Sequence, residues 1–300
     1  MSFGHYQVAQ YSRIGNRSSN HDRCLVLKRG DTVLLAVADG LGNQPSSGQA
    51  AQCLVDQLTH LFAQISIPIA DPPSFLKSIL VQAHKKVLEL QSGESSPPRT
   101  TAVVCLIQAN RARWIHCGDS RLYFIRNGCI HRRTRDHSVV ETLIQHQAIS
   151  EQESRSHPQR HQLTSCVGGA ENRWVFGISP EICLEPNDYI LLCSDGLWSP
   201  LSSVQILQNC QTPSLDRGLD TLTAMAEKNS WPHSDNVSAV GFKLLHTAAP
   251  AIAALDKPPS IPLPTKASTV DDAILEIQRA YDTYAHEIDS AAPPNSRLKK

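Results

Sequence analysis

Residues 33–40 read Val33-Leu34-Leu35-Ala36-Val37-Ala38-Asp39-Gly40. Their near-continuous apolar run is typical of a strand in a sheet that is covered on both faces. The run ends in Asp39, so a carboxylate meets solvent at a rigid point, where a buried strand stops.

Three other aspartates stand beside apolar runs in the same way. Asp119 follows Trp114-Ile115-His116-Cys117-Gly118, Asp195 follows Ile190-Leu191-Leu192-Cys193-Ser194, and Asp235 precedes Asn236-Val237-Ser238-Ala239-Val240. Carboxylates that converge repel one another unless a cation neutralises them. The repetition therefore predicts a site for a hard metal ion.

Composition excludes several classes of protein. Lys+Arg and Asp+Glu both number 28 in 300 residues, so the formal net charge is zero and nothing favours nucleic acid or an anionic membrane as the main partner. The 41% apolar content is enough for a sizeable core. The longest apolar runs, such as 102–107, are far shorter than the roughly 20 residues of a membrane span, and residues 1–5 lack the pattern of a signal peptide.

The nine cysteines indicate a reducing compartment. They form neither CxxC nor CxxH pairs, and several lie inside apolar runs, as Cys105, Cys117 and Cys193 do. This pattern favours buried free thiols over disulfides or zinc ligands, so we expect a cytoplasmic protein.

A compositional break near residue 246 divides the chain into a domain, 1–246, a Pro/Ala-rich linker, 247–267, and a C-terminal amphipathic helix with a tail, 268–300. In the last segment apolar residues recur every three or four positions, at Val270, Ile274, Ile277, Tyr281, Tyr284 and Ile288. Such a helix can dock on its own domain, or it can bind a partner or a second copy; the sequence leaves both readings open.

Within 1–246 the signals for strands and helices come in blocks. Strands are predicted over 6–11, 24–28, 33–38, 102–107, 112–117, 121–125 and 129–132, and helices over 49–63, 73–90, 139–147, 203–208 and 215–227. Asn127-Gly128 is a strong hairpin signal because both residues tolerate positive φ. Links of two to five residues cannot cross over a parallel sheet, so we expect antiparallel strands in an α+β layered domain.

With the aspartates placed, the chain resembles the metal-dependent Ser/Thr protein phosphatases of the PP2C (PPM) family, in its bacterial form. The resemblance runs from about residue 15 to 242 and rests on segments that stand in the family's order: Gly15-Asn16-Arg17-Ser18-Ser19-Asn20-His21-Asp22, Val37-Ala38-Asp39-Gly40-Leu41-Gly42, Thr100-Thr101-Ala102, Gly118-Asp119-Ser120-Arg121, Asp136-His137-Ser138, His157-Pro158-Gln159-Arg160 with Leu163-Thr164, Leu192-Cys193-Ser194-Asp195-Gly196-Leu197 and Asp235-Asn236-Val237-Ser238. Each segment alone is a weak signal, whereas eight in order are a strong one.

The resemblance implies a fold and a reaction. The fold is a four-layer αββα sandwich, in which two antiparallel sheets pack face to face, helices cover both outer sides and metals lie at one end. The reaction is hydrolysis of phosphoserine or phosphothreonine by in-line attack of a water that two metal ions activate. All-oxygen ligands suit Mg²⁺ or Mn²⁺ better than zinc.

The resemblance also assigns roles to particular residues. It implies that Asp39 bridges two ions, that the Gly40 carbonyl binds one of them, and that Asp195 and Asp235 bind the other. Asp22 is expected to hold metal-bound water. No protein nucleophile is required.

The resemblance implies two further roles. Asp119, with Asp195, matches the site of a third, weaker metal ion in bacterial relatives. Arg17 matches the arginine that binds the substrate phosphate, a task that suits a guanidinium fork better than a lysine.

The sequence departs from the family pattern near these residues. His21 stands where Glu or Gln usually precedes the aspartate, and Asn43-Gln44 stands where the family has a histidine. Gln49 replaces a common Glu, and Arg99 replaces the Gly before the paired threonines. An imidazole cannot accept from two metal waters as a carboxylate does and can itself be charged near neutral pH, so we expect a weaker second metal. The general acid stays unassigned.

Two functions of different classes remain. The first is a phosphatase acting on a phosphorylated protein and opposing a bacterial Ser/Thr kinase, which the retained Asp39, Asp195 and Asp235 favour. The alternative, which His21 keeps open, is a catalytically weak phosphoprotein-binding or scaffold domain with a partner-docking C-terminal helix. The sequence identifies neither the phosphoprotein nor the pathway.

Overall fold

The computed structural model describes residues 5–42, 45–90, 98–169 and 174–246. The predicted linker, 247–267, and the predicted C-terminal helix, 268–300, lie outside the described residues.

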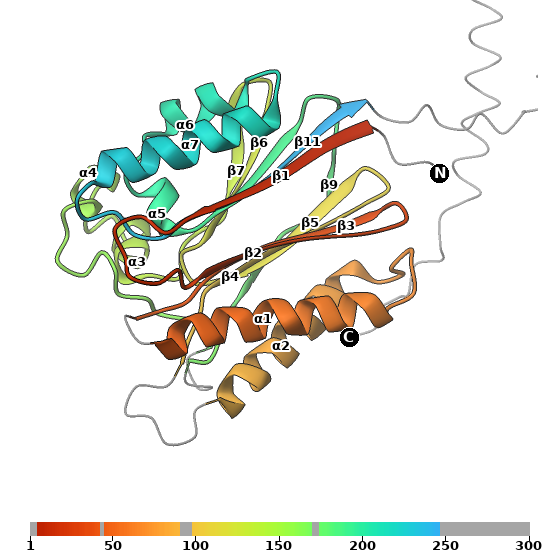
Figure 1. Ribbon diagram of the computed structural model, residues 1–300, viewed down its shortest axis with the longest axis horizontal. Coiled ribbons are helices and arrows are strands. Elements are labelled where there is room, and N and C mark those ends of the chain that lie inside the picture. The colour runs from red at the N-terminus through yellow and green to blue at the C-terminus, as the bar shows by residue number, and fades with distance from the viewer. Residues whose placement is uncertain (1–4, 43–44, 91–97, 170–173, 247–300) are drawn as a thin grey trace, which may run out of the picture. The chain divides into compact units, whose positions relative to one another are not determined.

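Two antiparallel sheets form the middle of the domain, with one above the other in Figure 1. The first has the order β1-β11-β10-β6-β7, and its strands are β1 His5–Arg13, β11 Val237–His246, β10 Tyr189–Cys193, β6 Arg121–Arg126 and β7 Cys129–Arg133. The second has the order β2-β3-β4-β5-β8, with β9 also pairing with β5, and its strands are β2 Asp22–Arg29, β3 Thr32–Asp39, β4 Ala102–Gln108, β5 Arg111–Cys117, β8 Gly177–Ile178 and β9 Ile182–Cys183.

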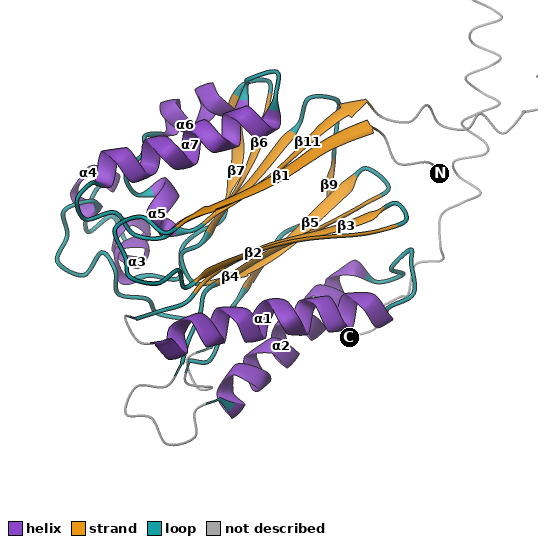
Figure 2. Cartoon of the chain, viewed as in Figure 1, coloured by secondary structure: helices purple, strands orange, loops and turns teal. Residues whose placement is uncertain are grey.

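Helices cover the outer face of each sheet (Figure 2). The helices α1 Pro45–Gln64 and α2 Pro72–Glu89 pack on the second sheet, while α5 Asp195–Trp198, α6 Ser203–Cys210 and α7 Leu215–Ser230 pack on the first. Two short helices, α3 Val139–Gln145 and α4 Glu151–Ser154, lie between β7 and β8 in the chain. The predicted αββα sandwich is therefore confirmed.

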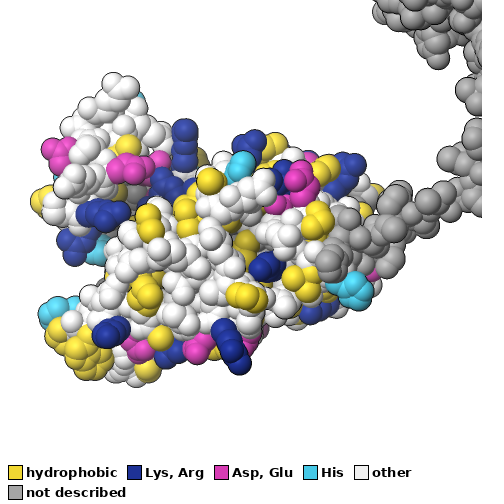
Figure 3. All heavy atoms as spheres, turned by 90° about the horizontal axis from the view of Figure 1, so that it is seen from above, with side chains coloured by type: hydrophobic (Ala, Val, Ile, Leu, Met, Phe, Trp, Pro, Cys, Tyr) yellow, Lys and Arg dark blue, Asp and Glu magenta, His cyan; other side chains and the backbone are white. Residues whose placement is uncertain are grey.

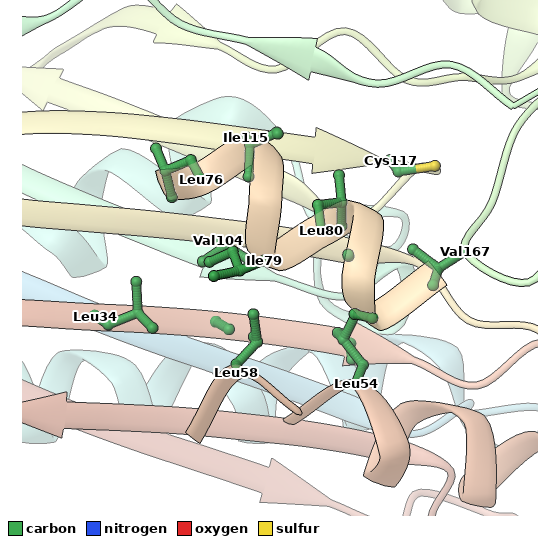
Figure 4. Packing of buried hydrophobic residues seen from close by; sticks show 14 of the residues in the cluster. Leu34, Leu54, Leu58, Leu76, Ile79, Leu80, Val104, Ile115, Cys117 and Val167 are labelled. Carbon is green, nitrogen blue, oxygen red and sulfur yellow. The ribbon is translucent and has the colours of Figure 1, made fainter. Parts of the chain in front are cut away.

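Strand β3 shows why its sequence is apolar throughout. Val33, Leu35 and Val37 face the other sheet, whereas Leu34 and Ala36 face the two helices beneath. Figure 4 shows the helix-facing cluster, in which Leu34 lies among leucines of α1 and α2. A strand that is buried on both faces needs apolar residues at both odd and even positions, so polar and apolar residues do not alternate along it.

Two short links between consecutive strands make different connections, one within a sheet and one between the two sheets. Asn127 and Gly128 have φ values of 50° and 73°, as the predicted hairpin requires, and they join the paired strands β6 and β7. The link 118–120 is also short but does not make a hairpin, because β5 belongs to the second sheet and β6 to the first. The expected antiparallel pairing holds within each sheet, and this link carries the chain from one sheet to the other.

The strand register brings the predicted site to one end of the sandwich. Asp22, at the start of β2, is paired with Asp39, at the end of β3. In the other sheet Cys193, at the end of β10, is paired with Ala239 of β11 and Arg121 of β6. Asp195 closely follows Cys193, while Asp235 precedes Ala239 and Asp119 precedes Arg121 by a few residues. All five aspartates therefore meet at the same end of the sandwich.

The described surface agrees with the balanced composition. Figure 3 shows Lys and Arg side chains interspersed with Asp and Glu on one face of the domain. All nine cysteines are free, as predicted, although Cys129 and Cys183 are exposed rather than buried. Among the described helices, none combines the length and the apolar character that crossing a bilayer requires.

Candidate metal centre

A cavity of about 1030 Å³ opens at the end of the sandwich where the aspartates meet. Asp39, Asp119, Asp195 and Asp235 line it. Asp22 is 3% exposed and does not line this cavity. The structure therefore brings together every aspartate that the sequence nominated, four at the cavity wall and one buried beside them.

Two threonines hold the end of β3 in place. The backbone N–H of Asp39 donates to Thr101 Oγ1 at 3.0 Å, and the Asp39 carbonyl accepts from the Thr101 N–H at 2.8 Å and from Thr100 Oγ1 at 2.9 Å. Gly40 follows because a Cβ there would lie 2.2 Å from the Ser47 carbonyl oxygen. The chain thus turns at Gly40 with the Asp39 backbone fixed on both sides.

Asp22 is buried among hydroxyl groups. Ser194 Oγ donates to Asp22 Oδ2 at 2.7 Å, and Ser194 Oγ itself accepts from the Ser238 N–H at 3.1 Å. Burial raises the pKa of Asp22 to about 7, and the charges of Asp195 and Asp235 add to that rise, while the hydroxyl hydrogen bonds oppose it. A nearby cation would therefore stabilise the ionised form of the Asp22 carboxyl.

Asp195 and Asp119 face the cavity from the first sheet and from the link between the sheets. Asp195 is the first residue of α5, and Gly196 follows it because a Cβ there would lie 2.1 Å from the Asn236 carbonyl oxygen. Asp119 is 7% exposed, and its carbonyl accepts from Trp198 Nε1 at 3.0 Å. Burial raises the pKa of both carboxyls, and their neighbouring aspartates raise it further.

Arg17 and Asp235 form an ion pair at the cavity wall, with Arg17 Nη2 2.7 Å from Asp235 Oδ2. Both side chains are 42% exposed, so the pair can exchange with a ligand from solvent. Gly15 brings the arginine's loop close, since a Cβ there would lie 2.1 Å from the Asp235 carbonyl oxygen and its φ is +63°. This ion pair could not be predicted from the sequence, because its two residues are 218 positions apart.

Asn236 is a structural residue that the sequence analysis did not single out. Its Oδ1 accepts from the His21 N–H at 2.8 Å, and its Nδ2 donates to the Ile14 carbonyl at 2.8 Å and to the Ser19 carbonyl at 3.1 Å. The buried amide thereby ties the loop that carries Arg17 to the start of β11. An Asn beside an Asp at a strand start was the available signal, but its partners are more than 200 residues away in sequence.

The electrostatics fit hard divalent ions. Burial raises the pKa of Asp39 well above its usual range, and Asp22, Asp195, Asp119 and Asp235 each raise it further, in that order. Within the described ranges, no three His, Cys, Asp or Glu side chains already stand in ligand geometry around one point. The donors are nevertheless carboxylate and carbonyl oxygens that repel one another, which is the donor set that Mg²⁺ and Mn²⁺ take.

The histidines near the site play different parts. His137 Nδ1 accepts from the Gly118 N–H at 3.2 Å, its ring stacks on His116, and it does not line the cavity. Burial lowers the pKa of His137 to about 4, so it stays neutral and anchors the link that carries Asp119. Of the three histidines in the segment 139–168, His146, His157 and His161, only His161 lines the cavity.

Comparison with known proteins agrees with this geometry. The sequence profile of the family described as protein phosphatase 2C matches residues 9–234. The chain belongs to this family. The match contains every predicted site residue except Asp235, which directly follows it.

The relatives are bacterial Ser/Thr protein phosphatases. The chain is 32% identical over 231 residues to the serine/threonine protein phosphatase PstP of Mycobacterium tuberculosis, covering 75% of this chain but 42% of PstP, less than half of its length. It is 26% identical to the protein phosphatase PhpP of Streptococcus pneumoniae, covering 77% of this chain and 95% of PhpP. A crystal structure of the PstP catalytic domain in complex with two manganese ions superposes with a TM-score of 0.68 at 27% identity, covering 80% of this chain and 98% of that one.

The raised pKa values predict how stability depends on pH when chelator removes divalent ions. A carboxyl whose pKa is raised in the folded state stabilises the fold below its unfolded pKa, and that contribution is lost as pH rises through the folded value. With EDTA, the free energy of unfolding should therefore fall between about pH 4 and pH 7, the window that Asp22 defines. Urea denaturation at several pH values measures this. The Asp22→Asn variant should show a shallower fall, and a wild-type curve that rises through this window would contradict the account.

Proposed function

We propose that the chain is a metal-dependent phosphatase that hydrolyses phosphoserine and phosphothreonine in protein substrates, with two Mg²⁺ or Mn²⁺ ions. The convergence of four aspartates and Arg17 on one cavity, with Asp22 buried beside them, carries this proposal. The names of the relatives support it, and they do not favour the alternative of a catalytically weak scaffold domain. The manganese ions in the PstP structure support the choice of metal.

The proposed ligands follow from the cavity and from the family register. Asp39 would contribute to both ions, with the Gly40 carbonyl at one of them and Asp195 and Asp235 at the other. Asp22 lies opposite Asp39 in the strand pair, and its buried carboxyl would orient water. When bound, the ions lower the pKa of an attacking water and offset the charge of the phosphoryl oxygens.

Arg17 positions the substrate in this proposal. Its guanidinium lies at the cavity wall with Asp235, so it can present two N–H donors to a phosphoryl group while its loop stays tied to β11 through Asn236. We further propose that Asp119 and Asp195 take a third, weaker ion, because both face the cavity and Asp195 raises the pKa of Asp119.

The wider biological setting is also part of the proposal. Phosphatases of this class reverse the action of Ser/Thr kinases, and we infer a cytoplasmic partner kinase and a phosphoprotein substrate. The free cysteines support a reducing compartment. The segment 268–300 is proposed to dock on the domain or on a partner through its apolar stripe.

The Asp39→Asn variant tests the metal centre. Removal of the bridging carboxylate should lower Mn²⁺-dependent hydrolysis of p-nitrophenyl phosphate by about a hundredfold or more, since even residues outside the ligand set change metal affinity by roughly 10–100-fold. Asp31→Asn is the matched control, because Asp31 is exposed at the opposite end of the same strand pair. Equal turnover by the Asp39→Asn variant and the wild type would refute the assignment.

His21 offers a test of the departure from the family pattern. Its backbone carbonyl accepts from the Gly40 N–H at 3.2 Å, and its Nδ1 lies 3.2 Å from the Gly42 carbonyl oxygen, so the ring stands beside the proposed centre. His21→Glu supplies a carboxylate there and should lower the Mn²⁺ concentration for half-maximal turnover about tenfold. His60→Glu, at an exposed position of α1, should leave that concentration unchanged. An unaltered metal dependence of the His21→Glu variant would show that the imidazole does not weaken metal binding.

A further inference from the structure

A second arginine reaches the cavity from a different part of the chain. Of the described residues that line the cavity, Arg17 and Arg99 are the Lys or Arg side chains. Arg17 comes from the loop between β1 and β2, and Arg99 directly precedes Thr100, before β4. Arg99 stands where the family pattern has a glycine, so its side chain adds a charge that the resemblance does not account for.

The backbone around Arg99 is fixed by its neighbours. The Arg99 carbonyl accepts from the Leu41 N–H at 2.9 Å, which ties it to the loop after Asp39. On its other side, Thr100 exchanges backbone hydrogen bonds with Val167, at 3.0 and 2.8 Å. Gly168 packs closely against this strand, since a Cβ there would lie 2.7 Å from the Pro98 carbonyl oxygen. The arginine therefore projects from a rigid point.

The charge of Arg99 is available to a ligand. In the described part of the chain Arg99 is exposed and forms no ion pair, whereas Arg17 is paired with Asp235. Its charge acts on Cys166, another residue of the cavity wall, where burial raises the pKa of the thiol and the Arg99 charge opposes that rise. The two arginines therefore have different neighbours in the cavity wall, Cys166 for Arg99 and Asp235 for Arg17.

We propose that Arg99 is a specificity-determining residue that binds a second anionic group of the substrate, a carboxylate or a phosphate close to the phosphorylated residue. The inference rests on the proposed function, in which Arg17 takes the phosphoryl group that is hydrolysed. A guanidinium suits either anion, because its N–H donors match two oxygens at once. The enzyme should therefore prefer phosphopeptides whose sequence is acidic near the phosphoserine.

The test compares three phosphoserine peptides that differ at one flanking position, with Ala, Glu or a second phosphoserine there, and repeats this at each position from −3 to +3. Wild type should show kcat/KM about tenfold higher for the acidic peptides at one or two positions, which corresponds to roughly 1.4 kcal/mol. Arg99→Ala should abolish that preference through KM, and Arg99→Lys should restore part of it. Arg132→Ala, an exposed arginine of β7 away from the cavity, is the matched control.

Two further readouts separate the explanations. Turnover of p-nitrophenyl phosphate, which has no flanking residues, should be the same in Arg99→Ala and wild type. Binding of the dephosphorylated Glu peptide, followed by fluorescence anisotropy, should weaken about tenfold in the variant and should weaken in wild type as salt is raised. A similar rise in kcat/KM for the Glu peptide and for the peptide with a second phosphoserine indicates that Arg99 recognises negative charge. A rise for the second phosphoserine alone identifies phosphate as the ligand.

The contrary outcomes are distinct. An equal loss for the Ala peptide, the Glu peptide and p-nitrophenyl phosphate would show that Arg99 serves the reacting phosphoryl group or the loop after Asp39, which overturns the inference. An absence of any acidic preference in wild type would overturn it as well. Wild type that hydrolyses neither p-nitrophenyl phosphate nor any peptide with Mn²⁺ would instead refute the proposed function on which the inference rests.

Discussion

Five carboxylates that repel one another meet at one end of the sandwich, and the segments around them must hold them there. Burial raises the pKa values of Asp22, Asp39, Asp119 and Asp195, neighbouring aspartates raise them further, and four of the five carboxylates share a single cavity. Such a cluster costs stability when every member is ionised. It persists because each aspartate is fixed by a strand end, a link between sheets or a helix start that packs into the core.

Close backbone approach is what allows that convergence. Gly15, Gly40 and Gly196 each stand where a Cβ would lie within about 2.2 Å of a carbonyl oxygen on another segment. The glycine beside an aspartate is therefore a steric requirement of the site, since a side chain there would push a carboxylate away from its neighbours. Hydrogen bonds from Thr101 and Asn236 then hold these segments together. The same scaffold sets the position of Arg99, through Leu41 and Val167.

Most of the fold could be predicted because long apolar strands and amphipathic helices carry strong local signals. The strands around residues 33–38 and 102–107 follow directly from continuous apolar runs, and the helices α1 and α2 follow from helical periodicity. The step between sheets at residues 118–120 could not, because a short link permits either a hairpin or a change of sheet and only packing decides. The two-residue strands β8 and β9 and the one-turn helices α4 and α5 are too short to leave a pattern.

Some features of the site could likewise be predicted from the sequence, and others could not. Asp39, Asp119, Asp195 and Asp235 could be predicted because each stands beside an apolar run, and the family resemblance gave them separate roles. Asp22 has no such run before it and was found through the resemblance alone. The Arg17–Asp235 ion pair, the tether at Asn236 and the place of His161 in the cavity wall depend on contacts between distant segments, which one sequence does not reveal. The sequence identified Arg99 as a departure from the family pattern. Only the structure shows that Arg99 lines the cavity, where its charge can bind a ligand.

A calorimetric titration of the chelator-treated protein with Mn²⁺ measures whether cations bind to this cluster of carboxylates. Two ions should bind per chain, with a third binding more weakly, and protons should be released on binding near pH 6 to 7, because the pKa values of Asp22, Asp39 and Asp195 are raised. Heats measured in two buffers of different ionisation enthalpy give the number of protons. Absence of saturable Mn²⁺ binding, or binding without proton release, would contradict the claim that a cation resolves the repulsion among these aspartates.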